Sequence, residues 1–389
     1  MRLPVFALYI MISSILHRLR YQLGKAFHAA EKKLRKKPAY AKNLMEYIDG
    51  KNIVLVHELP SPGPELILPL PLSVDGETDK FFIERQRVPL YPQYLIKIRN
   101  ARLTTKNGLL KLPDGRYSSE HIHHLLFYID QSPDHYHLFP KRFKTLKGKY
   151  YSLIGYCPGE HYHMMCDFTQ RVYNILQLLP EDVKYLFPTN IQQPVLDAFE
   201  LLGIPCDKRL IIGSGENLVI EELYWSPPSH QSGFDLPEAL DFVSSTILGK
   251  SFKNNDHNFS SKVYISRRGK RKVVNEAELL ALIKPLGFEE YELSRMSLQD
   301  QIDLFRSAKI IIGPHGAGLV NLMFCPPGTK VLELFPDPIL YGGTCYWSLA
   351  TAKGLDYTYL KCKTLMPVSD ADIIVPLEKI YSWLTNINY

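Results

Sequence analysis

A glycine-rich loop around His315 is the segment of the sequence with the clearest capacity for chemistry. Ile310–Ile312 predict a buried strand, and Gly313, Gly316 and Gly318 follow it in the run Gly-Pro-His-Gly-Ala-Gly. Such a loop lets a ligand approach the backbone, and a helix beginning near Gly316 offers N–H groups and a positive dipole end to a phosphate. The alternative is a tight turn with a structural histidine, since the spacing matches neither the dinucleotide fingerprint nor the P-loop.

A second phosphate-compatible segment is the basic loop after the predicted strand Val263–Ser266. Five of the six residues from 267 to 272 are Lys or Arg. Arginine forks match phosphate oxygens and keep their charge when partly buried. A solvated basic loop would have the same composition. In an open α/β sheet, however, ligands bind beyond the carboxyl ends of the strands, so we expect this loop beside the His315 loop.

A third segment combines histidines with carboxylates. His163 and Asp167 lie four residues apart on a helix predicted over 161–179 and therefore share one face. Together with Glu160 they are candidates for a base that deprotonates a hydroxyl. The alternative is that His163 and Asp167 only satisfy each other's hydrogen bonds.

Two patterns imitate metal sites. Asp370-Ala371-Asp372 has an Asp-x-Asp spacing, but it precedes an apolar helical pattern, so N-capping of a helix over 372–385 explains it better. Histidines occur at 121, 123, 124, 135 and 137 without the carboxylate spacing of a metal hydrolase. We therefore expect no metal ligands in either segment.

The elements that must position these residues alternate from about residue 150 onward. Strands separated by helices predict parallel strands with right-handed crossovers, and hence an open α/β sheet. Helices are expected after Asn275, with Glu278 completing a capping box, and after Ser297. A last helix over 372–385 is expected to fold back across the domain junction.

Residues 51–118 form a different texture of short apolar runs broken by turns. Arg99-Asn100 is expected to separate two of these strands, and the pairs Asn107-Gly108 and Asp114-Gly115 predict hairpins. The predicted organisation is a basic arm (1–42), a β-rich N-terminal region forming an appendage (43–150), an acceptor-side α/β domain (151–250), a donor-binding α/β domain (251–371) and a C-terminal helix (372–389).

The composition is that of a globular protein, with 46% hydrophobic and 22% charged residues. Residues 1–42 hold ten Lys or Arg and one acidic residue, and they account for the net charge of +6. The rest of the chain is therefore not a basic, nucleic-acid-binding surface. Six scattered cysteines without a CxxC pair indicate reduced thiols.

The apolar run Leu3–Leu16 is shorter than the ~20 residues of a spanning helix. Because basic residues follow it, we expect no cleaved secretory signal. A helix lying on an anionic membrane surface fits the pattern. A mobile basic terminus that contacts nothing fits it equally well.

Taken together, the three chemical segments resemble glycosyltransferase family 61. That family shows a Tyr-His-rich helix with an acidic residue, a strand ending in Ser-Arg-Arg, an Asn-Glu-capped helix, and Gly-x-His-Gly-Ala-Gly-Leu before an apolar strand with Glu. The corresponding segments follow in the same order, across about residues 94–340: Tyr162–Asp167, Tyr264–Arg268, Asn275-Glu276, Gly313–Leu319 and Val331–Leu334.

The resemblance implies a GT-B-like α/β architecture, with two Rossmann-like domains facing a cleft and the donor in the C-terminal one. It also implies inversion without an essential metal and a UDP-sugar donor, with Glu333 on the ribose hydroxyls. The donor-binding residues that it implies are Arg267, Arg268, Arg271, Lys272, Gly313, His315, Gly316, Ala317, Gly318 and Glu333. The implied catalytic residues are Asp167, His163 and Glu160, with Asp167 or Glu160 as the acceptor base.

The function expected from this resemblance is transfer of a hexosyl, N-acetylhexosaminyl or pentosyl group from a UDP-sugar to a hydroxyl. The acceptor would be a glycan, a lipid-linked glycan or a protein, in polysaccharide or glycoconjugate synthesis at the cytoplasmic face of a membrane. The alternative is a nucleotide-sugar-binding or scaffold protein that lacks turnover. A nucleic-acid-binding protein that uses the basic arm is disfavoured by the near-neutral body.

Overall fold

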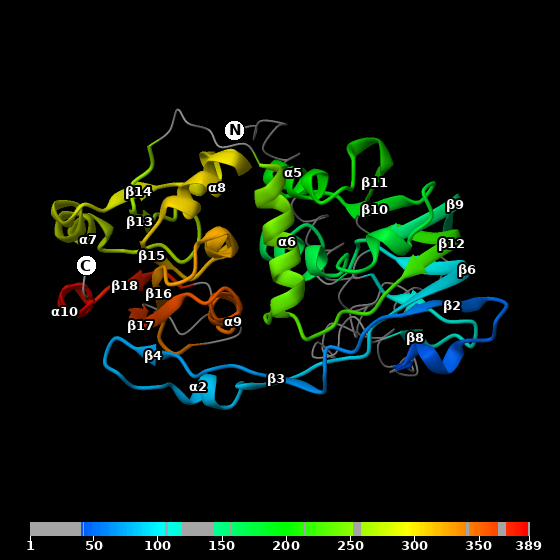
Figure 1. Ribbon diagram of the computed structural model, residues 1–389, viewed down its shortest axis with the longest axis horizontal. Helices are drawn as coiled ribbons and strands as arrows, with labels where there is room; N and C mark the ends of the chain where they lie inside the picture. The colour runs from blue at the N-terminus through cyan, green and yellow to red at the C-terminus, as the bar shows by residue number, and fades with distance from the viewer. Residues whose placement is uncertain are drawn as a thin grey trace, which may run out of the picture.

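The computed structural model describes residues 40–41, 43–105, 108–118, 143–155, 157–213, 215–251, 258–339, 342–364 and 371–387 (Figure 1). Apart from β1 (Tyr40–Ala41), the basic arm lies outside these residues, as do the histidines from 121 to 137 and Asp370. Within the described part of the chain, no helix is long and apolar enough to cross a membrane.

The N-terminal domain is built on a mixed sheet with the strand order β1-β8-β7-β6-β12-β9-β10-β11, and β2 pairs with β6. The strands β12, β9, β10 and β11 are parallel, whereas β6 is antiparallel to β12 and to β2. Their bounds are β2 Ile53–Glu58, β6 Tyr94–Thr104, β7 Leu110–Lys111, β8 Tyr117–Ser118, β9 Phe143–Ser152, β10 Lys184–Pro188, β11 Arg209–Ile212 and β12 Asn217–Trp225.

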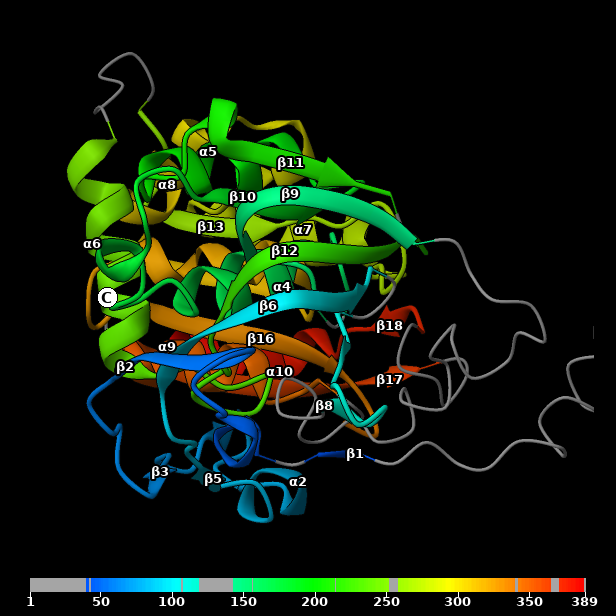
Figure 2. The ribbon, with the colours of Figure 1, turned by 90° about the vertical axis from the view of Figure 1, so that its right-hand side faces the viewer.

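Five strands of residues 43–150, namely β2, β6, β7, β8 and β9, belong to this sheet, so the region does not form a separate appendage. Figure 2 looks onto the sheet and shows β6 between β2 and β12, as their pairing requires. The strand break predicted at Arg99-Asn100 is also wrong. Asn100 adopts a left-handed φ of 49°, but β6 continues through it because β12 pairs with it on both sides of this point.

The C-terminal domain is built on the sheet β14-β13-β15-β16-β17-β18, which is parallel from β14 to β17. This confirms the predicted open α/β sheet in the second half of the chain. The strand bounds are β13 Lys262–Ile265, β14 Glu289–Tyr291, β15 Ile310–Pro314, β16 Lys330–Pro336, β17 Asp356–Thr364 and β18 Ile373–Ile374. The helices are α7 Glu276–Ile283, α8 Leu298–Ser307, the 3-10 helix η9 Ala317–Phe324, α9 Cys345–Ala352 and α10 Leu377–Asn386.

The ends of these helices test the predicted capping. The Ser297 side chain accepts a hydrogen bond from the Asp300 N–H, which confirms the cap of α8. The Asn275 side chain does not cap α7, because it bonds instead to both backbone groups of Val375. Asp372 is not an N-cap either, because α10 begins only after Pro376.

The last helix, α10, does not fold back to the domain junction. Ile380, Trp383 and Leu384 of α10 are buried in the same cluster as Leu279 of α7. In Figure 1 the two helices lie together at the outer end of the C-terminal domain, because the apolar face of α10 covers that side of the sheet.

A segment that we call the crossing arm connects the two domains, from β3 (Glu65–Ile67) through β4 (Leu72–Ser73) and α2 (Lys80–Ile83) to β5 (Arg87–Pro89). It leaves the N-terminal domain after β2, adds β4 to the C-terminal sheet beside β17, and returns to β6. Phe82 anchors it in a buried aromatic cluster with Trp347 and Tyr359.

Helix α6 (Pro237–Lys250) stands between the two domains in Figure 1. Its buried residues Leu240, Val243 and Ile247 pack in one cluster with residues of both domains. The remaining helical elements are η1 Leu44–Tyr47, α4 His161–His163, the π-helix η4 Met164–Phe168, η5 Leu176–Leu178, α5 Gln193–Leu201, η6 Cys206–Lys208, η7 Lys284–Leu286 and η8 Leu293–Arg295. The helix predicted over 161–179 therefore runs as α4 and η4 through residue 170, and turns separate it from η5.

Candidate functional site

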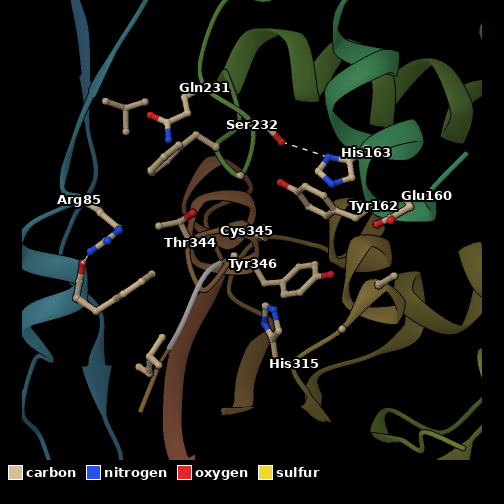
Figure 3. A pocket seen from close by; sticks show the side chains of 18 of the residues that line it. Arg85, Glu160, Tyr162, His163, Gln231, Ser232, His315, Thr344, Cys345 and Tyr346 are labelled. Carbon is tan, nitrogen blue, oxygen red and sulfur yellow. Dashed lines mark hydrogen bonds between the residues drawn. The ribbon is translucent and has the colours of Figure 1, made fainter. Parts of the chain in front are cut away.

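A cavity of about 720 Å³ lies where the two domains and the crossing arm meet. Its size falls within the range of about 300–1,000 Å³ that is typical of ligand pockets. Figure 3 shows His163 on the wall from the N-terminal domain and His315 on the wall from the C-terminal domain. Of the expected site residues, those that line the cavity are Glu160, His163, Arg271, His315, Gly316 and Ala317.

The His315 loop follows the buried strand β15, as predicted. The Arg267 guanidinium lies across the loop and donates from Nη1 to the His315 carbonyl oxygen at 3.0 Å. A Cβ atom at Gly316 would lie 1.3 Å from the same nitrogen. Glycine is therefore required at 316 so that Arg267 can hold the loop, and Arg267 acts on the loop from outside the cavity lining.

The imidazole of His315 is held by a buried carboxylate. Its Nδ1 lies 2.5 Å from Oε1 of Glu333, which is 0% exposed, and Tyr357 donates to the other carboxylate oxygen at 2.5 Å. The ring also stacks on Phe335, with the centroids 5.0 Å apart. This arrangement leaves Nε2 of His315 to face a ligand in the cavity.

Glu333, which is expected on the ribose hydroxyls, lies buried beside His315. Both of its carboxylate oxygens bond to protein groups, and it does not line the cavity. Its geometry supports a role in orienting His315.

The basic loop after β13 divides its cations among several partners. Arg268 lies among three carboxylates, at 2.7 Å from Glu276, 2.6 Å from Glu290 and 3.7 Å from Glu292. Arg268 does not line the cavity, so its arrangement favours a structural role over the expected contact with a diphosphate.

Lys272 and Arg271 also take different positions. Lys272 contacts Asp372, which accepts the Lys272 backbone N–H at 2.9 Å and lies 3.8 Å from its ammonium group. Arg271 reaches the cavity and has a left-handed φ of 60°. Within the basic loop, Arg271 is therefore the cation placed to meet a ligand in the cavity.

On the opposite wall, His163, Asp167 and Ser232 form a hydrogen-bonded group. His163 Nδ1 lies 2.8 Å from Oδ2 of Asp167, and Ser232 donates to the same oxygen at 2.5 Å. Ser232 Oγ also lies 3.2 Å from His163 Nδ1, as the dashed line in Figure 3 marks. The predicted pairing of His163 with Asp167 is confirmed. The π-helix η4 carries Asp167, and such helices are frequent at functional sites.

The charges of this pair stabilise each other. Burial opposes the charge on His163, but the hydrogen bond that its ring donates to Asp167 prevails and raises the pKa of the imidazole to about 10. Burial likewise opposes the charge on Asp167, yet the same bond lowers the pKa of its carboxyl below the usual value. At neutral pH the ring is therefore protonated and donates hydrogen bonds.

The two carboxylates expected as the acceptor base differ in access. Glu160 is exposed and lines the cavity. Asp167 is not among the lining residues, because it lies behind His163 and Ser232. The geometry therefore favours Glu160 over Asp167 as the group that can reach an acceptor hydroxyl.

Sequence reasoning missed the third side of the cavity. The crossing arm contributes Arg85, whose guanidinium lies 4.1 Å from the Phe81 ring centre. Phe81 in turn packs on Gly343, where an added Cβ would lie 3.0 Å from the ring. Local patterns cannot pair these two residues, because they are far apart in the chain. The adjacent glycines 342–343, just before α9, indicate only that some other segment can approach closely there.

A family model matches the segment of the chain that carries much of this site. Residues 161–332 match the family model described as Glycosyltransferase 61, which confirms the resemblance. The matched segment begins at α4 and ends in β16, and it includes His163 and His315. The part of the chain that carries both cavity histidines is therefore the part that matches this family.

Individual relatives are similar over a limited region. The chain is 37% identical over 112 residues to "Protein O-linked-mannose beta-1,4-N-acetylglucosaminyltransferase 2" of Canis lupus familiaris, covering 26% of this chain and 18% of that protein. It is 38% identical over 102 residues to "EGF domain-specific O-linked N-acetylglucosamine transferase" of Drosophila melanogaster, covering 24% and 18%. These matches thus span less than a fifth of the relatives' length.

Among solved structures, the bacterial iron-containing dodecameric glycosyltransferase TibC from enterotoxigenic E. coli H10407 is 12% identical to this chain. The alignment covers 77% of this chain and 80% of that one, with a TM-score of 0.26. That score is too low to carry an argument about the fold.

Proposed function

We propose that this protein is an inverting glycosyltransferase of GT-B architecture that uses a UDP-sugar and an acceptor hydroxyl. The observation that carries the proposal is the pair of supported histidines, His163 and His315, which face one cavity from two domains. A cleft between two α/β domains can hold a donor on one wall and an acceptor on the other. The match of residues 161–332 to family 61 supports this reaction class.

The donor diphosphate would lie at the C-terminal wall. His315 presents Nε2 and Arg271 brings a positive charge, and Gly316 and Ala317 line the same wall. Preorganised donors and charges placed where negative charge develops stabilise a leaving phosphate, which is a large contribution to catalysis.

The transfer step would use Glu160 as the base. The acceptor hydroxyl gives its proton to the Glu160 carboxylate while its oxygen attacks the anomeric carbon. The bond from that carbon to the UDP oxygen breaks, UDP leaves with the electron pair, and the anomeric configuration inverts. His163, held by Asp167 and Ser232, would donate hydrogen bonds beside Glu160.

The names of the relatives narrow the substrates to be tried first. Both are N-acetylglucosaminyltransferases, one for O-linked mannose on protein and one for EGF domains. We therefore propose UDP-N-acetylglucosamine as the donor and a protein-linked hydroxyl as the acceptor. We also propose that transfer needs no metal and that the protein acts at the cytoplasmic face of a membrane.

The direct test is UDP release from a panel of UDP-sugars, with and without O-mannosyl peptides, EGF domains and free glycans, each in the presence of EDTA. Acceptor-dependent UDP release with UDP-N-acetylglucosamine supports the proposal. UDP binding without release for every donor and acceptor would favour the scaffold alternative. Activity that disappears in EDTA would contradict metal independence.

A further inference from the structure

The turn before α4 brings together a thiol, a carboxylate and an imidazole. One possible ligand atom from each of Cys157, Glu160 and His163 lies within 4.8 Å of the other two. Among the residues that the structure describes, these three are the one group of His, Cys, Asp or Glu side chains close enough together to hold a metal ion. Cys157 and His163 are half-buried and Glu160 is exposed, so an ion from solvent can reach them.

The turn that carries these residues has a fixed shape. The Glu160 N–H donates to the Cys157 carbonyl oxygen at 3.2 Å. Gly159 has a φ of 85°, and a Cβ there would lie 2.7 Å from the Thr189 carbonyl oxygen. Cys157 itself has a left-handed φ of 47°, which is uncommon for a residue with a side chain. The backbone thus holds the thiol on the same side as Glu160.

The imidazole is oriented in the way that metal-binding histidines usually are. Its Nδ1 pairs with the Asp167 carboxylate, which itself accepts from Ser232, so a metal would take Nε2 and would replace the hydrogen bond between His163 and Cys157. A carboxylate behind the ring fixes its orientation and strengthens the opposite nitrogen as a ligand. Asp167 lies four residues after His163 on the adjoining η4, and Ser232 reaches it from a separate loop.

The donor set selects the kind of cation. Thiolate and imidazole ligands favour zinc over magnesium or calcium, which prefer oxygen. Tetrahedral zinc with bonds of about 2.0–2.3 Å sets its ligand atoms roughly 3.5 Å apart, so a small contraction of the turn completes the site. Three protein ligands leave a fourth position open.

We propose that Cys157, Glu160 and His163 form a binding site for a thiophilic divalent cation, with zinc as the type case, and that the bound ion blocks glycosyl transfer. Binding replaces the protons of the thiol and the imidazolium, which are released to solvent. The ion then occupies Glu160, so this residue can no longer accept the proton of an acceptor hydroxyl. The inhibitory half of this inference rests on the proposed function, whereas the binding half does not.

Cobalt(II) is the probe for binding, because a thiolate–cobalt bond gives a sulfur-to-metal charge-transfer absorption. The full-length protein, stripped with EDTA and then freed of it, is titrated with Co²⁺. We expect a band that saturates at one ion per chain, disappears on adding one equivalent of Zn²⁺ and withstands excess Mg²⁺.

Cys157→Ser should remove the band, and Cys206→Ser is the matched control because Cys206 is an exposed cysteine elsewhere in the chain. Cys157→Asn provides a second variant, since asparagine tolerates the left-handed backbone at 157. Asp167→Asn should keep the band but weaken Co²⁺ binding by about tenfold or more. A band that persists in both Cys157 variants, or that is absent from the wild type, would overturn the site.

Measurements of zinc inhibition distinguish a failure of this inference from a failure of the proposed function. If transfer is observed, Zn²⁺ should inhibit the wild type and Cys206→Ser alike. Cys157→Ser should keep its basal activity and need at least about tenfold more Zn²⁺ for the same inhibition. Equal zinc sensitivity of the three proteins would overturn the inhibitory role. A protein that shows the cobalt band but no transfer would refute the proposed function and leave the metal site standing.

Discussion

The two histidines that face the cavity are each supported by a carboxylate, but in different surroundings. Glu333 behind His315 is 0% exposed and bonds to Tyr357. In the other pair, the side chains of His163 and Asp167 are each 16% exposed.

This difference distinguishes two walls of the cavity, a rigid wall around His315 and an adaptable wall around His163. Glu333 lies on β16, and Gly313 in the neighbouring strand β15 leads to His315, so the central sheet sets the position of this pair. Asp167 lies on a short π-helix, and Ser232 reaches it from a loop. A rigid wall suits a constant group such as a diphosphate, whereas loops suit an acceptor that differs between enzymes.

Removing the base on the adaptable wall should have the largest effect. Glu160→Gln is expected to lower kcat by about 10²–10⁴-fold, because the amide cannot accept the acceptor proton. UDP affinity should stay within about twofold, since the diphosphate is held across the cavity. Steady-state UDP release and calorimetric titration with UDP measure the two quantities. Glu84→Gln is the matched control, because Glu84 lines the cavity from the crossing arm. An equal loss in both variants would refute the base assignment.

A second buried carboxyl near the His163 pair should make stability depend on pH. Burial, with a smaller contribution from the charge of Asp167, raises the pKa of Asp235 from 3.8 to about 7. The folded state then binds more protons than the unfolded state between these values, so stability falls as pH rises from about 4 to about 7. The contribution lost is on the order of 4 kcal/mol.

Urea unfolding of the wild type and Asp235→Asn at a series of pH values measures this effect. The amide cannot ionise, so the variant should lack the decline between pH 4 and 7. Parallel pH profiles for the two proteins would show that Asp235 is not the group responsible.

The histidines themselves should separate binding from transfer. His315→Ala is expected to weaken UDP binding by about tenfold to a hundredfold, the worth of a charge-assisted hydrogen bond. His163→Ala should leave UDP affinity nearly unchanged and lower the rate of transfer. Calorimetric titration of both variants with UDP checks this. A similar loss of UDP affinity in both would refute the proposal that UDP binds at the His315 wall alone.

The smallest expected effect concerns the supports of the two pairs. Tyr357→Phe leaves one oxygen of the buried Glu333 without its donor, so we expect a loss of about 1–3 kcal/mol in the free energy of unfolding. Ser232→Ala removes a donor from the more accessible Asp167 and should cost about 1 kcal/mol or less. Chemical denaturation compares them, and a larger loss for Ser232→Ala would reverse the assignment of rigid and adaptable walls.

Local sequence patterns predicted the parts of the site that depend on local geometry. The spacing of four residues paired His163 with Asp167, and the apolar run before Gly313 placed a buried strand ahead of the His315 loop. The Ser297 cap was predicted for the same reason, because an N-cap depends on groups three residues apart.

Contacts between distant segments could not be predicted in this way. Arg268 has the composition of a phosphate ligand, but Glu276 and Glu290 reach it from α7 and β14 and engage it first. The crossing arm carries Arg85 to the cavity only because β4, some 280 residues before β17 in the chain, pairs with it. Such neighbours are set by sheet topology, which local periodicity does not encode.

A crystal structure of the protein with UDP bound would show whether the His315 wall of the cavity binds the diphosphate of a nucleotide-sugar. We expect phosphate oxygens within hydrogen-bonding distance of His315 Nε2 and beside Arg271, with Glu160 across the cavity and Arg268 still among its carboxylates. Phosphates bound at Arg268, or outside the cavity with His315 untouched, would refute this placement of the donor.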